Sequence, residues 1–427
     1  MNLGSVIFIL AFLIGLIFNP RTAFAQQNLG WKDLLTAAKE NSLQIKTQSF
    51  LTEGSEADHK RAWGGVLPKI DLEGKKTTAE KKTGANNVSG ITLPSTSQDI
   101  KIEDTQAKLT LPLFRGFATL ADIRKTEAEY QKSLQDKKLS EISLRHELRK
   151  VVTSYLLAIE RQKVYLRLLE RQKLNVDLLK LKYNSGSEAR WGHKQARADL
   201  QFYEWRVEEQ RKQESLSFLQ LVVLTGIEPN SLRLKITLAE LSKVDASENL
   251  PRHPEIRIRE LGIQSAAEDV VTAKSQLFPQ VDAFYGIQNV KPSVGAETSE
   301  RIYGIGLRWN IFAGFSDYNQ ISQARALKMA KEAELEFEKR KLELEFKESK
   351  EKLSLMQEKL PILEGSLEAA RERAKTVNEQ YKAGLRSYLD WEQSQSKLIR
   401  SEEDLLEGKN SLLLAIADYE KQQGLGL

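Results

Sequence analysis

Two hydrophobic periods alternate along the chain, one typical of helices and the other typical of strands. Between Phe117 and Ser185 there is neither Gly nor Pro, and apolar residues recur at steps of three and four. This spacing predicts one amphipathic helix with coiled-coil character. At 1.5 Å per residue it would be roughly 100 Å long, whereas an average helix has about 11–12 residues. We therefore expect an elongated rod to which the other elements attach.

Elsewhere the period changes to two, which is typical of strands with one apolar face. The stretch between the first two predicted strands is rich in Thr, Lys, Asn, Gly and Ser and is interpreted as a long mobile loop. The predicted strands are 68–77, 100–113, 279–290 and 301–312. The predicted helices are 31–62, 117–182, 188–224, 254–277, 315–382 and 387–422.

The two halves of the chain repeat the same order of elements. Phe114-Arg-Gly-Phe117 recurs as Phe312-Ala-Gly-Phe315 at an offset of 198 residues, and this offset then holds for more than a hundred residues. Pro68 and Pro279, each the first residue of a predicted strand pair, are 211 residues apart. A constant register of this length indicates an internal duplication. The predicted units are a first repeat at 26–226, a linker or equatorial segment at 227–253 and a second repeat at 254–427.

One difference between the repeats lies in the second long helix, which contains Pro361 and Gly365. A proline inside a helix removes a backbone hydrogen bond and bends the helix. We therefore expect a kink at this point, to which the sequence assigns no function.

The first 25 residues have the pattern of a secretory signal peptide. Val6 to Phe18 is an almost unbroken apolar run, too short to span a membrane as a stable helix. It is followed by Ala23-Phe24-Ala25, a small-x-small cleavage pattern. We expect cleavage after Ala25; because the start lacks Lys and Arg, an uncleaved anchor is the alternative. No apolar run of 18 residues follows, so strands would have to make any membrane contact.

The length of the strands suggests how such contact would be made. Strands of about ten residues suffice to cross a bilayer at a tilt. An open sheet in lipid would leave unpaired N–H and C=O groups at its edges, and the smallest membrane barrels have eight strands. Several copies would therefore share one barrel, above a ring of helices that encloses a tube. The alternative is a soluble sheet that caps a coiled coil.

Composition and charge narrow the functional classes. Charged residues make up 29% of the chain and the net charge is +5, with Lys and Arg interleaved with Glu, as in solvated helical faces. No basic block with interleaved aromatics is present, so we expect no nucleic-acid partner. The chain has no Cys, which excludes disulfides and thiolate metal sites. Its four His residues have no metal-site spacing, and catalytic motifs are absent from the sequence; we expect no enzyme activity, metal or cofactor.

The duplicated junctions and the turns Tyr183-Asn-Ser-Gly186 and Tyr381-Lys-Ala-Gly384 resemble those of the outer membrane efflux protein family, of which TolC is the name-giver. The segment from Tyr381 to Asp390 is similar to the family signature Y-x-x-G-x-R-x-x-L-D. The resemblance implies a TolC-like fold, mostly α with a β-barrel part. It implies a homotrimer whose twelve-stranded outer-membrane barrel, four strands per chain, continues into an α-helical tunnel through the periplasm.

The same resemblance implies a function and partners. The chain would be the outer-membrane channel of a tripartite efflux or type I secretion system. It would meet a periplasmic adaptor, an inner-membrane transporter and outer-membrane lipid. The implied adaptor-docking tips are Tyr183, Gly186, Ser187, Tyr381, Gly384 and Leu385.

A constriction of the tunnel is implied at Asp390, where three copies would form a carboxylate ring that attracts cations. Many family members carry a second Asp where this chain has Gln393, which would weaken the ring. Arg386 lies four residues before Asp390 and could pair with it. For the tips the alternative is an ordinary tight turn. For Arg386 and Asp390 the alternative is an ordinary exposed ion pair on a helix.

Three aromatic residues on the predicted apolar strand face, Tyr285, Tyr303 and Trp309, are candidates for the lipid interface. The alternative is packing against a neighbouring subunit. Two other functions stay open, a periplasmic adaptor and a secreted structural coiled-coil protein. An adaptor would carry lipoyl-like and barrel domains, and a coiled coil would not need strands of membrane length. The sequence does not specify the substrate, the pump or the resting state.

Overall fold

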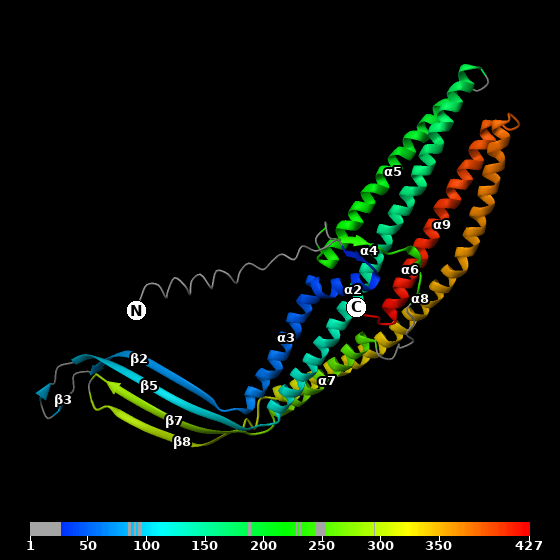
Figure 1. Cartoon of the computed structure of the whole chain (residues 1–427). Helices are drawn as coiled ribbons and strands as arrows, with labels where there is room; N and C mark the ends of the chain where they lie inside the picture. The colour runs from blue at the N-terminus through cyan, green and yellow to red at the C-terminus, as the bar shows by residue number, and fades with distance from the viewer. Residues whose placement is uncertain are drawn as a thin grey trace, which may run out of the picture.

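The computed structural model describes residues 27–427, apart from 84–86, 89–90, 93–95, 187–188, 228, 230–231, 245–252 and 294. It is an elongated column of helices with four long strands extending from one end (Figure 1). The predicted fold class, mostly α with a small sheet and an internal duplication, is confirmed. The predicted signal peptide lies outside the described residues.

Two helices of 67 residues form the axis of the column: α4 (Ala118–Asn184) and α8 (Ser316–Lys382). Each is about 100 Å long at 1.5 Å per residue. Helix α8 continues through Pro361 and Gly365, so the expected kink does not interrupt it; instead α8 curves along its length (Figure 1). Pro361 is exposed, so water can hydrate the carbonyl that the proline leaves without a backbone donor.

The shorter helices pack along the two long ones. Helices α3 (Leu43–Trp63) and α5 (Arg190–Thr225) contact α4, and α7 (Pro254–Ser275) and α9 (Tyr388–Gln422) lie between α4 and α8. The predicted single helix 31–62 is wrong, because it breaks at Ser42, whose ψ of 124° is not helical. The segment before it, α2 (Trp31–Asn41), lies at the middle of the column and contacts α5 (Figure 1).

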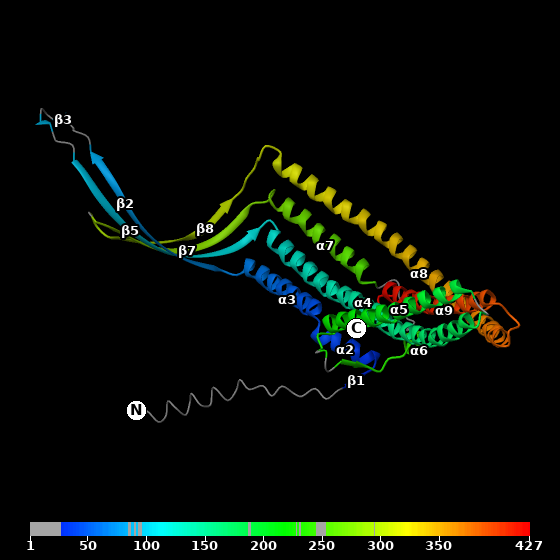
Figure 2. The same ribbon diagram turned by 90° about the horizontal axis from the view of Figure 1, so that it is seen from above.

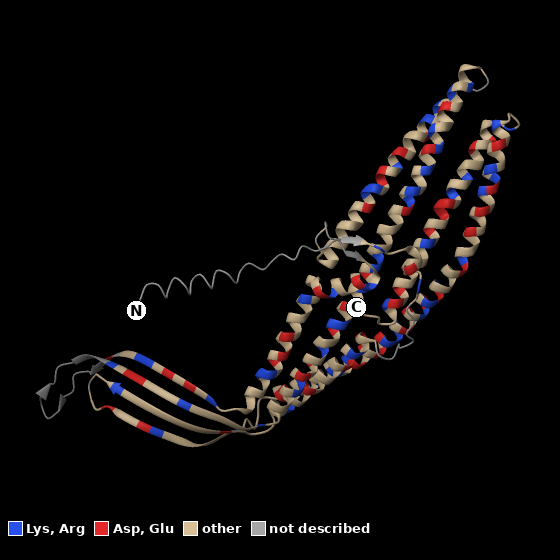
Figure 3. Ribbon diagram, in the orientation of Figure 1, with Lys and Arg blue, Asp and Glu red and all other residues tan. Residues whose placement is uncertain are grey.

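In the lower half of the column the helices form one layer in the order α3, α4, α7, α8, with α3 and α8 as its edges (Figure 2). In the upper half the order is α5, α4, α9, α8. Acidic and basic residues are interspersed along all of these helices (Figure 3). Within the described part of the chain, none of the helices combines the length and the apolar character needed to span a membrane.

Four antiparallel strands form the sheet in the order β2-β5-β7-β8. Their bounds are Lys69–Thr83, Thr96–Arg115, Gln280–Pro292 and Thr298–Arg308. The first two are longer than predicted, because the ladder continues from Lys69↔Thr110 to Thr83↔Thr96 through much of the supposed loop. This extension is polar and therefore escapes a hydrophobic criterion. Just before it, within the predicted strands, Lys76 and Glu103 form a cross-strand ion pair at 2.6 Å.

Smaller elements complete the described chain. A short 3₁₀ turn, Gly64–Val66, precedes β2, and β3 (Asn87–Val88) pairs with β4 (Ile91–Thr92). Within the predicted linker, β6 (Leu232–Leu234) pairs in parallel with β1 (Gln27–Leu29), and α6 (Leu238–Leu241) follows. The β1–β6 pair joins the start of the described chain to the middle of the column, a long-range contact that the sequence pattern did not predict.

The duplication extends to the register of the sheet. Ile70 pairs with Leu109, and Val281 pairs with Leu307; these partners differ by the same 211 and 198 residues that relate the repeats in sequence. The strand-to-helix junctions also repeat, because Gly116 and Phe117 both have positive φ (61° and 73°), as do their counterparts in the second repeat (both 63°). The two repeats therefore have the same local geometry.

The main hydrophobic core lies at the middle of the column, where α2, α4, α5 and α9 meet. Within it the side chain of Arg149, 2% exposed, pairs with the carboxylate of Glu420 and donates to the carbonyl oxygen of Leu241. Arg145 Nε donates to the other oxygen of Glu420 at 3.3 Å. This ionic cluster ties α4 to α9 and to the linker.

Candidate functional site at the helical tips

The two helical tips lie at the end of the column opposite the sheet (Figure 1). Gly186 and Gly384 each have φ of 75°, which glycine adopts without the steric penalty of a Cβ. Their amides donate to the carbonyl oxygens of Tyr183 and Tyr381, at 3.0 and 3.1 Å. Leu385 is 75% exposed beside the second turn, and Ser187 lies outside the described residues.

Three aromatic side chains pack behind the second tip. Tyr381 is 2% exposed, and its ring centroid lies 6.3 Å from that of Tyr388 and 5.6 Å from that of Trp391. Trp391 Nε1 donates to Asn378 Oδ1 at 2.9 Å. Burial raises the pKa of Tyr388 to about 12. Sequence reasoning found Tyr381 but missed Tyr388 and Trp391, although their three-residue spacing places both on one face of a predicted helix.

Ser387 is the N-cap of α9, and Asp390 is the third residue of that helix. Asp390 Oδ2 accepts from the backbone N–H of Ser387 at 3.3 Å, while Ser387 Oγ accepts from the backbone N–H of Asp390 at 3.2 Å. These two bonds form a capping box. The hydrogen bond from the Ser387 hydroxyl lowers the pKa of the Asp390 carboxyl, and the nearby Arg386 lowers it further. Asp390 is therefore an ionised carboxylate that stabilises the N-terminus of α9 through the capping box.

Arg386, which could pair with Asp390, acts on that carboxyl through its charge. Its Nε donates to Gln380 Oε1 of α8 at 3.1 Å. Gln393 is exposed, one turn beyond Asp390 on α9. In the single chain these three residues do not converge on one point, and their role in a constriction stays a prediction.

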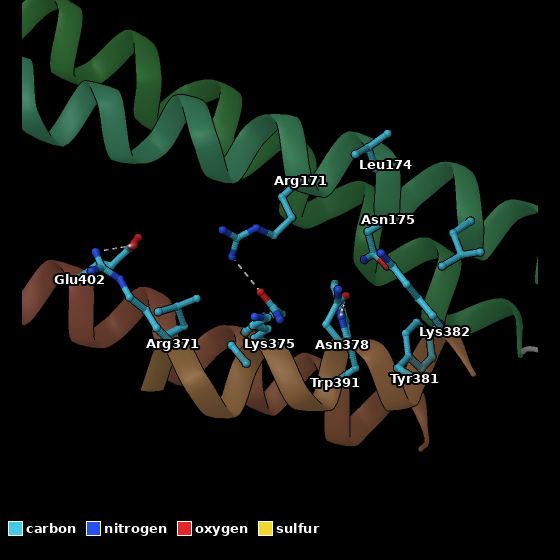
Figure 4. Close-up of a pocket in the computed structure, with 14 residues that line it drawn as sticks. Arg171, Leu174, Asn175, Arg371, Lys375, Asn378, Tyr381, Lys382, Trp391 and Glu402 are labelled. Atoms are coloured by element: carbon cyan, nitrogen blue, oxygen red, sulfur yellow. Dashed lines mark hydrogen bonds and ion pairs between the residues drawn. The ribbon is translucent and has the colours of Figure 1, made fainter. Parts of the chain in front are cut away.

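A cavity of about 520 Å³ lies behind the tips, between α4 on one side and α8 and α9 on the other (Figure 4). Arg171 reaches across it from α4, donating to Gln395 Oε1 of α9 at 2.9 Å. Lys182 Nζ lies 3.8 Å from the centroid of the Tyr381 ring. The residues that line the cavity are Arg171, Leu174, Asn175, Leu178, Arg371, Ala374, Lys375, Asn378, Tyr381, Lys382, Trp391, Gln395, Leu398 and Glu402. The sequence pattern gave no sign of this cavity.

The candidate interface aromatics lie at the opposite end of the molecule. Tyr285 and Tyr303 are directly opposite each other on β7 and β8 and are 41% and 77% exposed. Trp309 lies just beyond β8, and its Nε1 donates to the carbonyl oxygen of Leu277 at 3.2 Å. The predicted strand 301–312 thus begins three residues late and ends four residues late. Among the described residues, the segment after Arg308 pairs with no strand.

In the described part of the chain, metal-binding side chains do not form a cluster. Among the described residues, no group of three or more His, Cys, Asp or Glu side chains could hold a metal ion.

A duplicated column of very long helices, attached to an open four-stranded sheet, defines the class of TolC-like channel proteins. A family model described as outer membrane efflux protein matches residues 34–226 and 246–418, and the chain belongs to this family. A search of curated proteins finds no match.

Solved structures share the fold. The CmeC outer membrane channel of Campylobacter jejuni has a TM-score of 0.80 at 14% identity, over 92% of this chain and 85% of that one. The outer membrane protein VceC of Vibrio cholerae has a TM-score of 0.77 at 16% identity, over 93% and 96%. The MtrE outer membrane channel of Neisseria gonorrhoeae, in its open state, has a TM-score of 0.76 at 14% identity, over 94% and 93%.

Proposed function

We propose that three copies of this chain form an exit duct, with a shared twelve-stranded barrel in the outer membrane and a helical tunnel in the periplasm. The duct passively conducts substrates that an inner-membrane transporter delivers through a periplasmic adaptor, in a tripartite efflux or type I secretion system. Family membership supports the outer-membrane efflux role. The feature of the molecule that supports assembly from several copies is its pair of unpartnered edges.

The sheet ends at β2 on one side and at β8 on the other. One face of the sheet carries an apolar belt that includes Leu72, Leu109, Tyr285 and Ile305. Leu109 and Tyr285 are directly opposite each other, and Leu72 and Ile305 each lie two residues along their strands from this row. A sheet edge in lipid leaves N–H and C=O groups unpaired at several kcal/mol each. Pairing β8 of one copy with β2 of the next removes both edges.

The internal pairing β5–β7 predicts the register of that junction. Leu109 of β5 pairs with Tyr285 of β7. The counterpart of Leu109 in the second repeat is Leu307, and the counterpart of Tyr285 in the first repeat is Gly74, by the offsets of 198 and 211 residues. Leu307 of one copy should therefore lie opposite Gly74 of the next. The same relation gives the unpaired segment after Arg308 a partner in the neighbouring β2.

In the proposed trimer the other candidate residues have the following roles. The turns at 183–187 and 381–387 would dock the adaptor, and Asp390 would line the tunnel, in a ring weakened by Gln393. Tyr285 and Tyr303 would meet lipid near the outer end of the belt, and Trp309 near its inner end. Residues 1–25 would direct export and be removed.

Cysteine cross-linking tests the assembly, since the native chain contains no Cys. The double variant Leu307→Cys/Gly74→Cys should form disulfide-linked multimers up to the trimer in outer-membrane fractions. In the control Leu307→Cys/Lys75→Cys the second thiol is on the opposite face of β2, so cross-linking should be weak. The purified protein should also conduct ions in planar bilayers.

The outcomes separate the levels of the proposal. Equal cross-linking in the test and control pairs, from a protein that conducts, would reject the register only. A protein that remains a monomer and produces no conductance in bilayers would contradict the duct itself and favour a structural coiled-coil protein.

A further inference from the structure

The cavity behind the tips has more cations than carboxylates on its wall. Its lining includes four cationic side chains, those of Arg171, Arg371, Lys375 and Lys382 (Figure 4). Of the described residues in the lining, Glu402 alone carries a carboxylate. Elsewhere on α8, lysines are commonly paired with a carboxylate one turn away, as Lys347 is with Glu343 at 2.7 Å. The cavity wall departs from this charge balance.

Little within the chain neutralises these cations. Arg171 donates to an uncharged amide oxygen, and Lys382 lies over an aromatic ring. The guanidinium of Arg371 lies 3.7 Å from the carboxylate of Glu402, which is a long ion pair, and the Arg371 side chain is 59% exposed. Among the described residues, Lys375 has no carboxylate within ion-pair distance. An excess of positive charge in a recess with low-dielectric walls concentrates anions there.

The remaining wall suits an apolar body. Leu178 of α4 and Leu398 and Trp391 of α9 line the cavity, whereas Leu174 is 72% exposed at its rim. Asn175, 5% exposed, extends from α4 toward α8 (Figure 4), and its amide interacts with the hydroxyl of Tyr388. A volume of about 520 Å³ is typical of small-molecule sites, which combine apolar walls with a few convergent polar groups.

We propose that this cavity binds an amphipathic organic anion, with an aromatic or aliphatic body and a carboxylate or sulfonate group. The body packs against Leu178, Leu398 and Trp391, and the anionic group faces Arg371 and Lys375. Helices α4, α8 and α9 belong to one chain, so a single copy supplies the whole site. A bound anion contacts both helical pairs and therefore resists their separation. This site stands independently of the proposed duct.

Calorimetric titration of the full-length protein in lipid nanodiscs tests the site, with empty nanodiscs as the blank for partitioning. The probe is naphthalene-2-sulfonate, and 2-naphthylmethanol is its uncharged analogue. We expect saturable binding of the sulfonate at one site per chain. The alcohol should bind at least tenfold more weakly, and equal binding of the two would overturn the assignment of an anion site.

Two variants locate the binding. Arg371→Gln/Lys375→Gln should weaken sulfonate binding at least tenfold. The matched control Lys350→Gln/Lys359→Gln removes the same charge from exposed positions of α8 outside the cavity, and its affinity should stay within twofold of the native value. Equal losses in both would indicate general attraction to a basic surface and would reject the site.

A third variant fills the cavity without changing its charge. Ala374 is 3% exposed in the cavity wall, and Ala374→Trp should abolish sulfonate binding while helix content by circular dichroism stays native. Undiminished binding in this variant would place the ligand elsewhere and overturn the proposal. Conductance is recorded separately: a conducting channel that does not bind the sulfonate rejects this site alone, and a protein that binds without conducting rejects the duct alone.

Discussion

At the scale of single residues, the most consequential contact is the buried ionic cluster in the middle of the column. The side chain of Glu420 is 3% exposed and serves both Arg145 and Arg149. Taking charges out of water is costly, so removing one member of such a cluster leaves a buried charge without its compensating partner. The cluster therefore specifies how α4, α9 and the linker fit together.

Replacing Glu420 with Leu should lower the free energy of unfolding by about 3–5 kcal/mol, the range for breaking a buried ion pair. The control Glu407→Leu removes a carboxylate that is 59% exposed and bonded to Arg161, which should cost about 0–1 kcal/mol. Chemical unfolding followed by the helical circular dichroism signal measures both. Similar losses in the two variants would show that the buried cluster is not a major source of stability.

Asp390 combines a capping role with a proposed role in the tunnel, and two substitutions separate them. Asp390→Asn keeps an oxygen that can accept from Ser387 but removes the charge, whereas Asp390→Ala loses both. Cation block of single-channel conductance should weaken severalfold in both variants. Only the Ala variant should also lose about 1 kcal/mol of stability, the scale of a helix cap. Unchanged block in Asp390→Asn would exclude the carboxylate from the constriction.

At the scale of elements, the two strand-to-helix junctions have the same backbone but different surroundings. A Cβ at Gly116 would collide with the backbone carbonyl of Ser275, whereas a Cβ at Gly314 would meet nothing within 4 Å. By the repeat offset, the counterpart of Ser275 is Gly64. The space beside Gly314 is therefore where Gly64 of a neighbouring copy belongs in the proposed ring.

This difference predicts distinct failures for two equivalent substitutions. Both glycines have positive φ, so alanine adds backbone strain of about 1–3 kcal/mol at either position. Gly116→Ala should in addition destabilise the single chain. Gly314→Ala should keep native helix content but shift the protein from trimer to monomer, as measured by size-exclusion chromatography with light scattering. A fully trimeric Gly314→Ala protein would count against the proposed junction.

The elements that sequence could predict are those whose signal is local. The 67-residue helices have a sustained three- and four-residue period, and the duplication is visible in the spacing of Phe117 and Phe315. The polar end of β2 could not be found this way, because backbone pairing with β5 holds it. The Tyr388–Trp391 packing and the basic cavity depend on helices that meet only after folding, so periodicity alone could not reveal them.

At the scale of the whole molecule, repeat-related residues have different environments in one chain. Phe50 of α3 and Leu261 of α7 are counterparts at the offset of 211 residues. Leu261 is 3% exposed, because α7 lies between α4 and α8, whereas Phe50 is 68% exposed at the edge of the layer. Burying Phe50 would require a helix on its free side. In the proposed ring that helix is α8 of the next copy, as α8 covers α7 within the chain.

The same substitution at these two positions should therefore act on different steps of assembly. Leu261→Glu places an unpaired charge in the core of one chain, and we expect loss of the folded protein. Phe50→Glu leaves the charge in water in the monomer but buries it in the ring, so the monomer should fold and the trimer should fail. Phe50→Leu is the control that keeps an apolar contact and should assemble. Circular dichroism reports the folding, and light scattering with single-channel recording reports the assembly. A Phe50→Glu protein that forms conducting trimers would show that this face of α3 remains exposed to water in the assembled protein, and the ring order inferred from the repeats would have to be abandoned.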